Sequence, residues 1–454
     1  MMLTALAFVV AIALLIAVHE YGHYRMAVAV GVRVIRFSIG FGPQLLRWQP
    51  NGSPTEFVVC MLPLGGYVKM LDEREAPVAP ELQHMAFNRQ PLKSKVAIVA
   101  AGPAANLLLA VFLYAVVNWN GVQYPAAVLA SPAPESMAAQ SGIEGGERVL
   151  RAALAQDALS DIGSFEDVRW FLTRGALDGL DVRLELSNLP SGPNREVLLR
   201  LSELDSPEAS AQLFQSIGVS GPYTRPVLGE ILPDGAANRA GLREGDLVRR
   251  VGDVPIVDGQ QLRQMIRKSG STGIVDPKTW SVERRGALLQ IVVRPEVRQE
   301  GALHVGKIGA FVGSPPELVT VEYGAIDGLW HGVLRTWDVS ALTLKMIGRM
   351  LVGEASLKNL SGPLTIAEYA GKSAGIGLTQ YLLFLALISV SLGVLNLLPL
   401  PVLDGGHLMY YLWESIVGVP VSDVWMERLQ RGGIAVLLIM MSIAFFNDIS
   451  RLFG

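Results

Sequence analysis

The sequence predicts a polytopic helical membrane protein, because it combines long apolar segments with few charges and places one extended polar region between them. Of the 454 residues, 50% are hydrophobic and 17% are charged, whereas about 25% of residues are charged in typical soluble domains. The formal net charge of −3 gives no electrostatic reason to expect a nucleic-acid partner. The single cysteine, Cys60, excludes an intrachain disulfide and a metal site made of thiolates alone.

Four segments are long enough to cross a bilayer, which takes about 20 mostly apolar residues. The first covers residues 3–29. We expect it to be retained as a transmembrane helix, because it lacks the basic start and small-residue cleavage site of a signal peptide. The other segments cover residues 96–119, 378–398 and 432–446, and the last of these is the shortest.

Basic residues predict the orientation, because cytoplasmic loops carry an excess of Lys and Arg. Arg428 and Arg431 place the start of the fourth segment on the cytoplasmic side. The loop after the first segment should be cytoplasmic as well. The region between the second and third segments is then extracytoplasmic, together with both termini. The basic residues of the first loop are Arg33, Arg36, Arg47, Lys69, Arg74, Arg89, Lys93 and Lys95.

The extracytoplasmic region contains an internal repeat. Residues 138–147 (AAQSGIEGGE) recur as residues 237–246 (ANRAGLREGD), and short alternating apolar stretches typical of strands follow each copy. A short helix of small residues, a glycine turn and an acidic strand entry resemble a PDZ domain. The first copy is the weaker match, with Gly145-Gly146-Glu147 where the second copy has Glu244-Gly245-Asp246. In the second domain, residues 217–219 are the candidate carboxylate-binding loop.

These features predict five parts. Two tandem PDZ-like α+β domains are expected between two membrane domains, each of which has two transmembrane helices, and an amphipathic helical region near the membrane follows the second PDZ-like domain. In chain order, the expected boundaries are 1–121 for the first membrane domain, 122–220 and 221–313 for the PDZ-like domains, 314–377 for the amphipathic region and 378–454 for the second membrane domain.

Two segments each have two interpretations. Residues 323–352 have apolar side chains at helical spacing, with Trp330 and Trp337, so they form an amphipathic helix on the outer leaflet or an ordinary helix packed on the PDZ-like domains. Residues 55–70 are rich in Val, Leu and Tyr around Gly65-Gly66. They form a membrane-associated β-hairpin or re-entrant element whose edge accepts a substrate strand, or a plain cytoplasmic hairpin.

The first segment ends in a motif suited to metal chemistry. On a helix, His19 and His23 share one face and can reach one metal ion, with Glu20 beside them as a candidate base. His19 lies about 24 Å along the apolar helix, so the site should lie below the membrane surface. Ionisable groups at that depth are costly unless they are paired or bound. The alternative is a set of polar residues that face a helix bundle without a metal.

A second motif supplies a third ligand. A catalytic zinc ion needs three protein ligands and one open position. Residues 396–407 (NLLPLPVLDGGH) carry prolines and glycines that break a helix, and such breaks persist in membranes where they line a cavity. Asp404 is the acidic residue in this stretch, and it serves as the third ligand, as a helix N-cap, or as both. His407 is a rival ligand, although we favour an outer or structural role for it.

Together the two motifs resemble the site-2 protease family of intramembrane metalloproteases. The resemblance covers nearly the whole chain, from His19 through residues 62–67 (LPLGGY) and 101–106 (AGPAAN) to Asp404. It implies a Zn²⁺ ion on His19, His23 and Asp404, with Glu20 activating water. It also implies an enzyme that hydrolyses peptide bonds within transmembrane segments.

The resemblance further implies how the substrate is held. Asn396 would hold the substrate backbone near the metal, and the hairpin at Gly65, Gly66 and Tyr67 would clamp an extended segment. The family role is the second cut of a single-pass anti-sigma factor during an envelope stress response. The PDZ pair would act as a size filter in the periplasm, with both termini there and the chain in the bacterial inner membrane.

Two other classes compete with a protease. A transporter also uses broken helices with buried ionisable residues, but it gives the PDZ-like domains no role. A membrane adaptor that holds peptides on its PDZ-like domains leaves the buried His19, Glu20 and His23 unexplained. Replacement of Glu20 separates these readings, because an adaptor should be unaffected.

Overall fold

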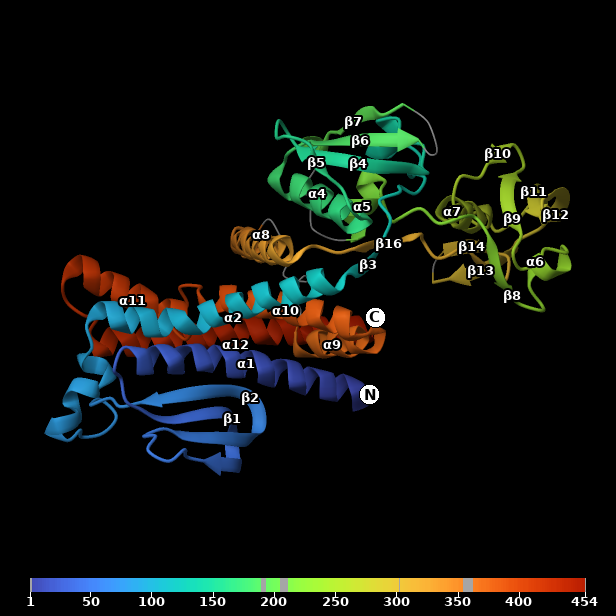
Figure 1. The fold of residues 1–454 in the computed structure, drawn as a ribbon. Helices are drawn as coiled ribbons and strands as arrows, with labels where there is room; N and C mark the ends of the chain where they lie inside the picture. Colours follow the sequence, from blue (N-terminus) through green and yellow to red (C-terminus); the bar gives the residue numbers. More distant parts are fainter. Residues whose placement is uncertain (1, 189–192, 205–210, 302, 354–361, 454) are drawn as a thin grey trace. The chain divides into compact units, whose positions relative to one another are not determined.

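The chain folds into two compact units (Figure 1). Unit 1 contains Met1–Gly121 and Glu322–Gly454, and unit 2 contains Val122–Val321. The chain enters and leaves unit 2 through paired strands, since β3 (Val122–Pro125) runs antiparallel to β16 (Leu318–Val321). The computed structural model describes residues 2–188, 193–204, 211–301, 303–353 and 362–453.

Four helices of unit 1 are long and apolar enough to cross a membrane, which confirms the prediction of four such segments. The fourth apolar stretch, expected to be the shortest, is extended by flanking residues, so α12 has 31 residues whereas α10 has 19. The helix α12 begins well before its apolar stretch and continues through Arg428 and Arg431. The four helices are α1 (Met2–Ala29), α2 (Leu92–Asn120), α10 (Leu378–Asn396) and α12 (Asp423–Phe453).

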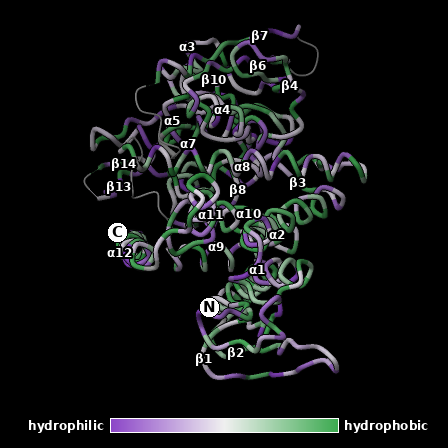
Figure 2. The backbone as a smooth tube through the Cα atoms, turned by 90° about the vertical axis from the view of Figure 1, so that its left-hand side faces the viewer, coloured by the Kyte–Doolittle hydropathy of each residue, from purple (hydrophilic) through white to green (hydrophobic). Residues whose placement is uncertain are grey.

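Small residues bring α1 and α2 together. A Cβ atom at Gly22 would lie 2.8 Å from Ala105 Cβ and would collide with the Ala101 carbonyl oxygen, so only glycine permits this approach. Small residues at such contacts are typical of helix packing in lipid, where close backbone approach replaces the hydrophobic drive. The residues of both helices are mostly hydrophobic (Figure 2).

Three further helices complete unit 1: α8 (Ala325–Leu351), α9 (Pro363–Ile376) and α11 (Asp404–Val417). The helix expected over residues 323–352 is α8. It packs on α2 through Gly328, where a Cβ atom would lie 2.6 Å from the Trp119 ring. Neither interpretation of this segment anticipated that contact. Trp330 and Trp337 remain exposed.

A bent two-stranded sheet lies beside α1 in unit 1 (Figure 1). Residues 55–70 do not form a hairpin by themselves, because β2 (Glu56–Met70) pairs along its length with β1 (Val34–Trp48). Ile39 pairs with both Gly66 and Val59, so the first half of β1 lies between two parts of β2. The sequence interpretation missed β1, whose alternating pattern is interrupted by glycines.

Unit 2 contains two lobes that we name by chain order. The first lobe has the sheet order β5-β4-β6-β7 and the second has β10-β9-β11-β12. The first lobe consists of α3 (Met137–Gln140), β4 (Glu147–Leu154), β5 (Ser160–Asp161), α4 (Phe165–Asp178), β6 (Val182–Asn188), β7 (Arg195–Leu199) and α5 (Ala211–Ile217).

The second lobe repeats this plan and adds two small sheets, β15-β8 and β13-β14. Its buried core is centred on Trp280, Val248 and Leu262. Its elements are β8 (Leu228–Ile231), α6 (Ala236–Arg239), β9 (Leu247–Val251), β10 (Val254–Pro255), α7 (Gly259–Ser269), β11 (Lys278–Arg284), β12 (Ala287–Val293), β13 (Glu296–Glu300), β14 (Leu303–Lys307) and β15 (Ala310–Val312).

The internal repeat has a structural basis in one buried carboxylate per lobe. In the second lobe, Arg284 Nε donates to Asp246 Oδ1 at 2.7 Å, and Arg284 also donates to the Gly241 carbonyl at 2.9 Å. In the first lobe, Arg195 makes the matching contacts to Glu147 and to the Gly142 carbonyl. The glutamate that departs from the repeat therefore occupies the same place as the aspartate.

The proposed carboxylate-binding loop at residues 217–219 was misplaced. Ile217 and Val219 belong to the core of the first lobe, and a Cβ atom at Gly218 would lie 2.6 Å from Ser136 Cβ. The segment therefore belongs to the first lobe rather than to the second, and it is packed against α3.

Candidate functional site

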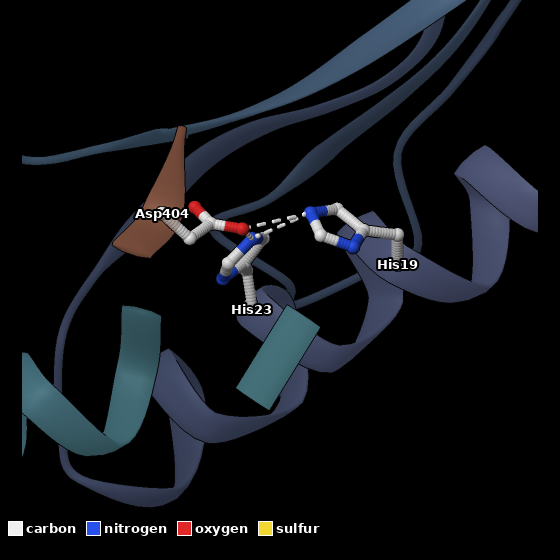
Figure 3. Close-up of side chains that lie close together, drawn as sticks. All are labelled: His19, His23 and Asp404. Carbon is white, nitrogen blue, oxygen red and sulfur yellow. Dashed lines mark hydrogen bonds and ion pairs between the residues drawn. The ribbon is translucent and has the colours of Figure 1, made fainter. Parts of the chain in front are cut away.

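The two histidines and the aspartate singled out by the sequence lie together in unit 1 (Figure 3). The helical spacing on α1 places His19 Nε2 3.1 Å from His23 Nε2. Asp404, the first residue of α11, brings its Oδ2 atom to 3.1 Å from His19 Nε2 and 3.6 Å from His23 Nε2. Two segments that are far apart in the sequence thus bring three possible metal ligands close together.

The proline-rich loop before α11 aims the Asp404 carboxylate. Leu403, not Asp404, is the N-cap residue of α11, and no side chain caps this helix end. Asp404 is therefore free to turn toward the histidines. The next residue, Gly405, has no space for a Cβ atom, which would collide with the Leu398 carbonyl, and Gly406 would collide with Leu400 in the same way. The two glycines are thus required by a backbone that folds back on itself.

The helix α2 forms the wall behind the two histidines. His23 Nδ1 lies 2.8 Å from the Ile98 carbonyl oxygen, to which it can donate. Gly102 faces both rings, and a Cβ atom there would lie 2.9 Å from His19 Cε1 and would collide with His23. The sequence interpretation gave no role to Ile98 or to Gly102. The available signal was Gly102-Pro103 inside an apolar helix, where glycine often marks a close approach.

The cluster is mostly shielded from solvent. The side chains of His19 and His23 are each 12% exposed, and that of Asp404 is 19% exposed. Within the described residues, Asp404 forms ion pairs with these histidines alone. Glu20 interacts electrostatically with all three side chains. A partly buried carboxylate without a Lys or Arg partner is costly, unless a cation completes the site.

The geometry fits a zinc ion. In a tetrahedral site with bonds of about 2.0 Å, neighbouring ligand atoms lie about 3.3 Å apart. The three separations in the cluster, 3.1, 3.1 and 3.6 Å, are close to that value. Two neutral imidazoles and one carboxylate are a known ligand set for catalytic zinc, and they leave the fourth position open.

The predicted substrate-binding residues lie at different places in unit 1. Gly66 is next to the cluster, since a Cβ atom there would lie 2.9 Å from Glu20 Cγ. Gly65 has a φ of +104° and packs on the ring of Phe41, on which Tyr67 also stacks. Asn396 is the last residue of α10, and its side chain makes no hydrogen bond to any other described residue.

His407 stays outside the group of close ligand atoms. Its ring packs edge-on against Tyr410 at a centroid distance of 6.0 Å. Both residues line a cavity of about 610 Å³ that also involves Lys95 and Glu414. The lining of this cavity combines charged and apolar side chains.

Comparisons with known proteins point to one family. The model described as Peptidase family M50 matches residues 7–440. A protein of Ralstonia nicotianae named "Putative zinc metalloprotease RSc1411" is 42% identical, with 100% of this chain and 99% of that protein covered. "Regulator of sigma-E protease RseP" of Escherichia coli and "Protease RseP" of Yersinia pestis are each 37% identical, with 98% of both chains covered.

Proposed function

Since the chain belongs to peptidase family M50, whose proteases use zinc, we propose that it cuts peptide bonds inside the membrane, within transmembrane segments of single-pass proteins. We assign the zinc ion to His19, His23 and Asp404. The observation that carries this proposal is the spacing of their three ligand atoms, which suits one tetrahedral ion. The apolar helix α1 supplies two of the ligands, so the reaction takes place at membrane depth.

When bound, the zinc ion would lower the pKa of a water molecule and polarise the scissile carbonyl. Glu20 takes the proton from the attacking water as the water oxygen bonds to the carbonyl carbon. The same carboxylate then passes the proton to the amide nitrogen as the C–N bond breaks. Glu20 is suited to both steps because it follows His19 directly on α1 and interacts with all three ligands.

The edge of the β1-β2 sheet offers the substrate a place to bind. A transmembrane helix hides its carbonyls in internal hydrogen bonds, so it must unwind before attack. Strand addition to an exposed edge gives an unwound backbone new hydrogen-bond partners. Gly66 lies at this edge beside Glu20, with Gly65 and Tyr67 next to it. Asn396 would contribute an amide to the substrate backbone.

The two lobes of unit 2 are assigned as tandem PDZ-like domains in the periplasm. Their matching sheets and matching buried carboxylates support a duplicated domain. We assign them the role of a size filter that admits substrates only after an earlier cut. The name of the Escherichia coli relative, "Regulator of sigma-E protease RseP", supports a role in the regulation of a sigma factor, and we therefore assign an anti-sigma factor as the substrate. The chain would then make the second cut in an envelope stress response, from an inner membrane with both termini in the periplasm.

The direct test uses full-length protein reconstituted in vesicles with a single-pass model substrate. We expect Glu20→Gln to lower the cleavage rate about 100- to 10,000-fold, the usual contribution of a general base, while zinc content stays at the wild-type level. Glu427→Gln, which removes an exposed carboxylate from α12, is the matched control and should cleave normally. Unchanged cleavage by Glu20→Gln would contradict the proposal and favour a peptide-holding adaptor.

A further inference from the structure

A buried amide on α2 lies next to the metal ligands. Asn106 is 1% exposed, and its side-chain amide lies 3.4 Å from His19 Nδ1. It lies one helical turn beyond Gly102, whose missing side chain lets α2 approach both histidine rings. The amide and the imidazole therefore meet in a place where water has little access.

Metal binding determines what His19 Nδ1 requires. When Nε2 gives its lone pair to the zinc ion, the neutral ring must carry its proton on Nδ1, and this N–H needs an acceptor. His23 meets the same requirement with the Ile98 carbonyl at 2.8 Å. For His19, the group at this position is the Asn106 amide.

The amide of Asn106 can supply that acceptor. Its Oδ1 atom is buried and has no hydrogen-bond partner, while Nδ2 faces His19 Nδ1. The orientation of an amide is assigned from the hydrogen bonds it makes. In either orientation one end of the Asn106 amide has no partner. Only the orientation in which Oδ1 and Nδ2 exchange places gives His19 Nδ1–H an oxygen to which it can donate.

The backbone of Asn106 is also held firmly. Ser389 Oγ, on α10, donates to the Asn106 carbonyl oxygen at 2.7 Å, and Ser389 is fully buried. This contact fixes α2 against α10 at the residue that faces His19. It does not involve the Asn106 side chain, so it can be removed separately.

We propose that Asn106 is a positioning residue, whose side-chain oxygen accepts a hydrogen bond from His19 Nδ1–H and thereby fixes the ring for zinc. The proposal rests on His19 being a zinc ligand, as assigned above. Asn106 acts through His19 and needs no contact with substrate. Partners of this kind typically contribute 10- to 100-fold to metal affinity.

The test measures zinc loss to a chelator and the visible spectrum of the cobalt-substituted protein, both on the full-length chain. We expect Asn106→Leu to weaken zinc binding about 10- to 100-fold and to alter the cobalt spectrum. Asn106→Asp keeps an acceptor oxygen and should hold zinc at least as tightly as wild type. Ser389→Ala removes the backbone contact alone and should leave zinc binding unchanged. If Asn106→Leu does not fold, Asn106→Ala gives the same comparison.

Wild-type zinc binding and a cobalt spectrum in Asn106→Leu would overturn the inference. Equal zinc loss in Asn106→Asp and Asn106→Leu would also overturn it, because packing rather than the acceptor would then be responsible. His19→Ala separates this inference from the proposed function. If His19→Ala keeps its zinc, the ligand assignment itself is wrong. If His19→Ala loses zinc but Asn106→Leu does not, only the role of Asn106 is wrong.

Discussion

The two units bury carboxylates in different ways. In unit 2, Asp246 is fully buried and receives two hydrogen bonds of 2.7 Å from Arg284, so the protein neutralises the charge itself. In unit 1, Asp404 faces His19 and His23, which are neutral when they act as metal ligands. The carboxylate in unit 2 therefore has its cationic partner within the chain, whereas the proposed role of Asp404 requires a cation from outside the chain.

A third carboxylate, also in unit 1, can be compared with Asp404. Asp448, on α12, is buried and accepts hydrogen bonds from the backbone N–H groups of Gly362 and Leu364 at 3.0 and 2.9 Å, and from Thr365. These groups lie at the start of α9, where a helix offers unpaired donors and partial positive charge. Asp404 is also at the start of a helix but turns away from it. This difference in orientation fits the proposed role of Asp404 as a metal ligand, whereas Asp448 caps α9.

The largest expected effect follows from Asp404→Asn. An amide keeps the size of the side chain but loses the charge and most of the affinity for zinc, so we expect more than the 10- to 100-fold loss seen for outer partners. Metal analysis and cleavage assays measure the result. Asp246→Asn is the matched control from unit 2 and should retain zinc. Equal zinc content in the two variants would contradict the claim that Asp404, unlike Asp246, binds the metal.

The second effect is on the stability of unit 2. Asp246→Ala leaves Arg284 without its partner, and breaking a buried pair costs about 3 kcal/mol or more. Hydrogen exchange of peptides from β9 and β11 in the full-length chain should show faster opening of the second lobe. Peptides from α1 should keep their wild-type protection. Unchanged exchange in β9 would mean that the pair is dispensable.

A smaller effect is expected for Asp448→Ala. Loss of a helix cap typically costs about 0.5–2 kcal/mol, so α9 should exchange faster near Thr365, while zinc content is unchanged. Loss of zinc in this variant would show that Asp448 is coupled to the metal site. The distinction between cap and ligand would then fail.

The smallest effect is on pH dependence. Burial alone would raise the pKa of Asp246, but hydrogen bonds from Arg284 and from the Arg243 backbone hold it below its ordinary value. A carboxylate with a lowered folded pKa stabilises the fold above its unfolded pKa of about 3.9, and this contribution is lost as the pH falls through the folded pKa. Hydrogen exchange at about pH 6 and about pH 3 should show acid destabilisation of the second lobe that is reduced in Asp246→Asn. Equal acid sensitivity in both proteins would assign the effect to other groups.

Local periodicity was sufficient to predict which side chains gather at the candidate metal site. His19 and His23 follow from helical spacing, and Asp404 follows from the prolines and glycines that break the helix around it. The four spanning helices follow from their apolar length. The repeat in unit 2 was also visible, although the sequence alone suggested that Glu147 weakens it. The structure shows that Arg195 reaches the longer side chain in the same way.

Contacts between distant segments were not predictable in this way. The strand β1 was missed because glycines interrupt its alternation and its partner β2 starts after a further loop. The roles of Gly102 and Asn106 depend on how α2 packs against α1, which no local pattern specifies. Residues 217–219 were assigned to the wrong lobe because a short Ile-Gly-Val stretch does not indicate which core it joins.

The most direct test of the central claim is zinc X-ray absorption on the purified full-length chain. The account predicts two imidazole nitrogens and oxygen ligands, all at about 2.0–2.2 Å and without sulfur. Substitution of His19 by alanine should leave at most one imidazole in the spectrum. A zinc ion with a sulfur ligand, or an imidazole contribution that persists unchanged in His19→Ala, would contradict the assignment of His19, His23 and Asp404.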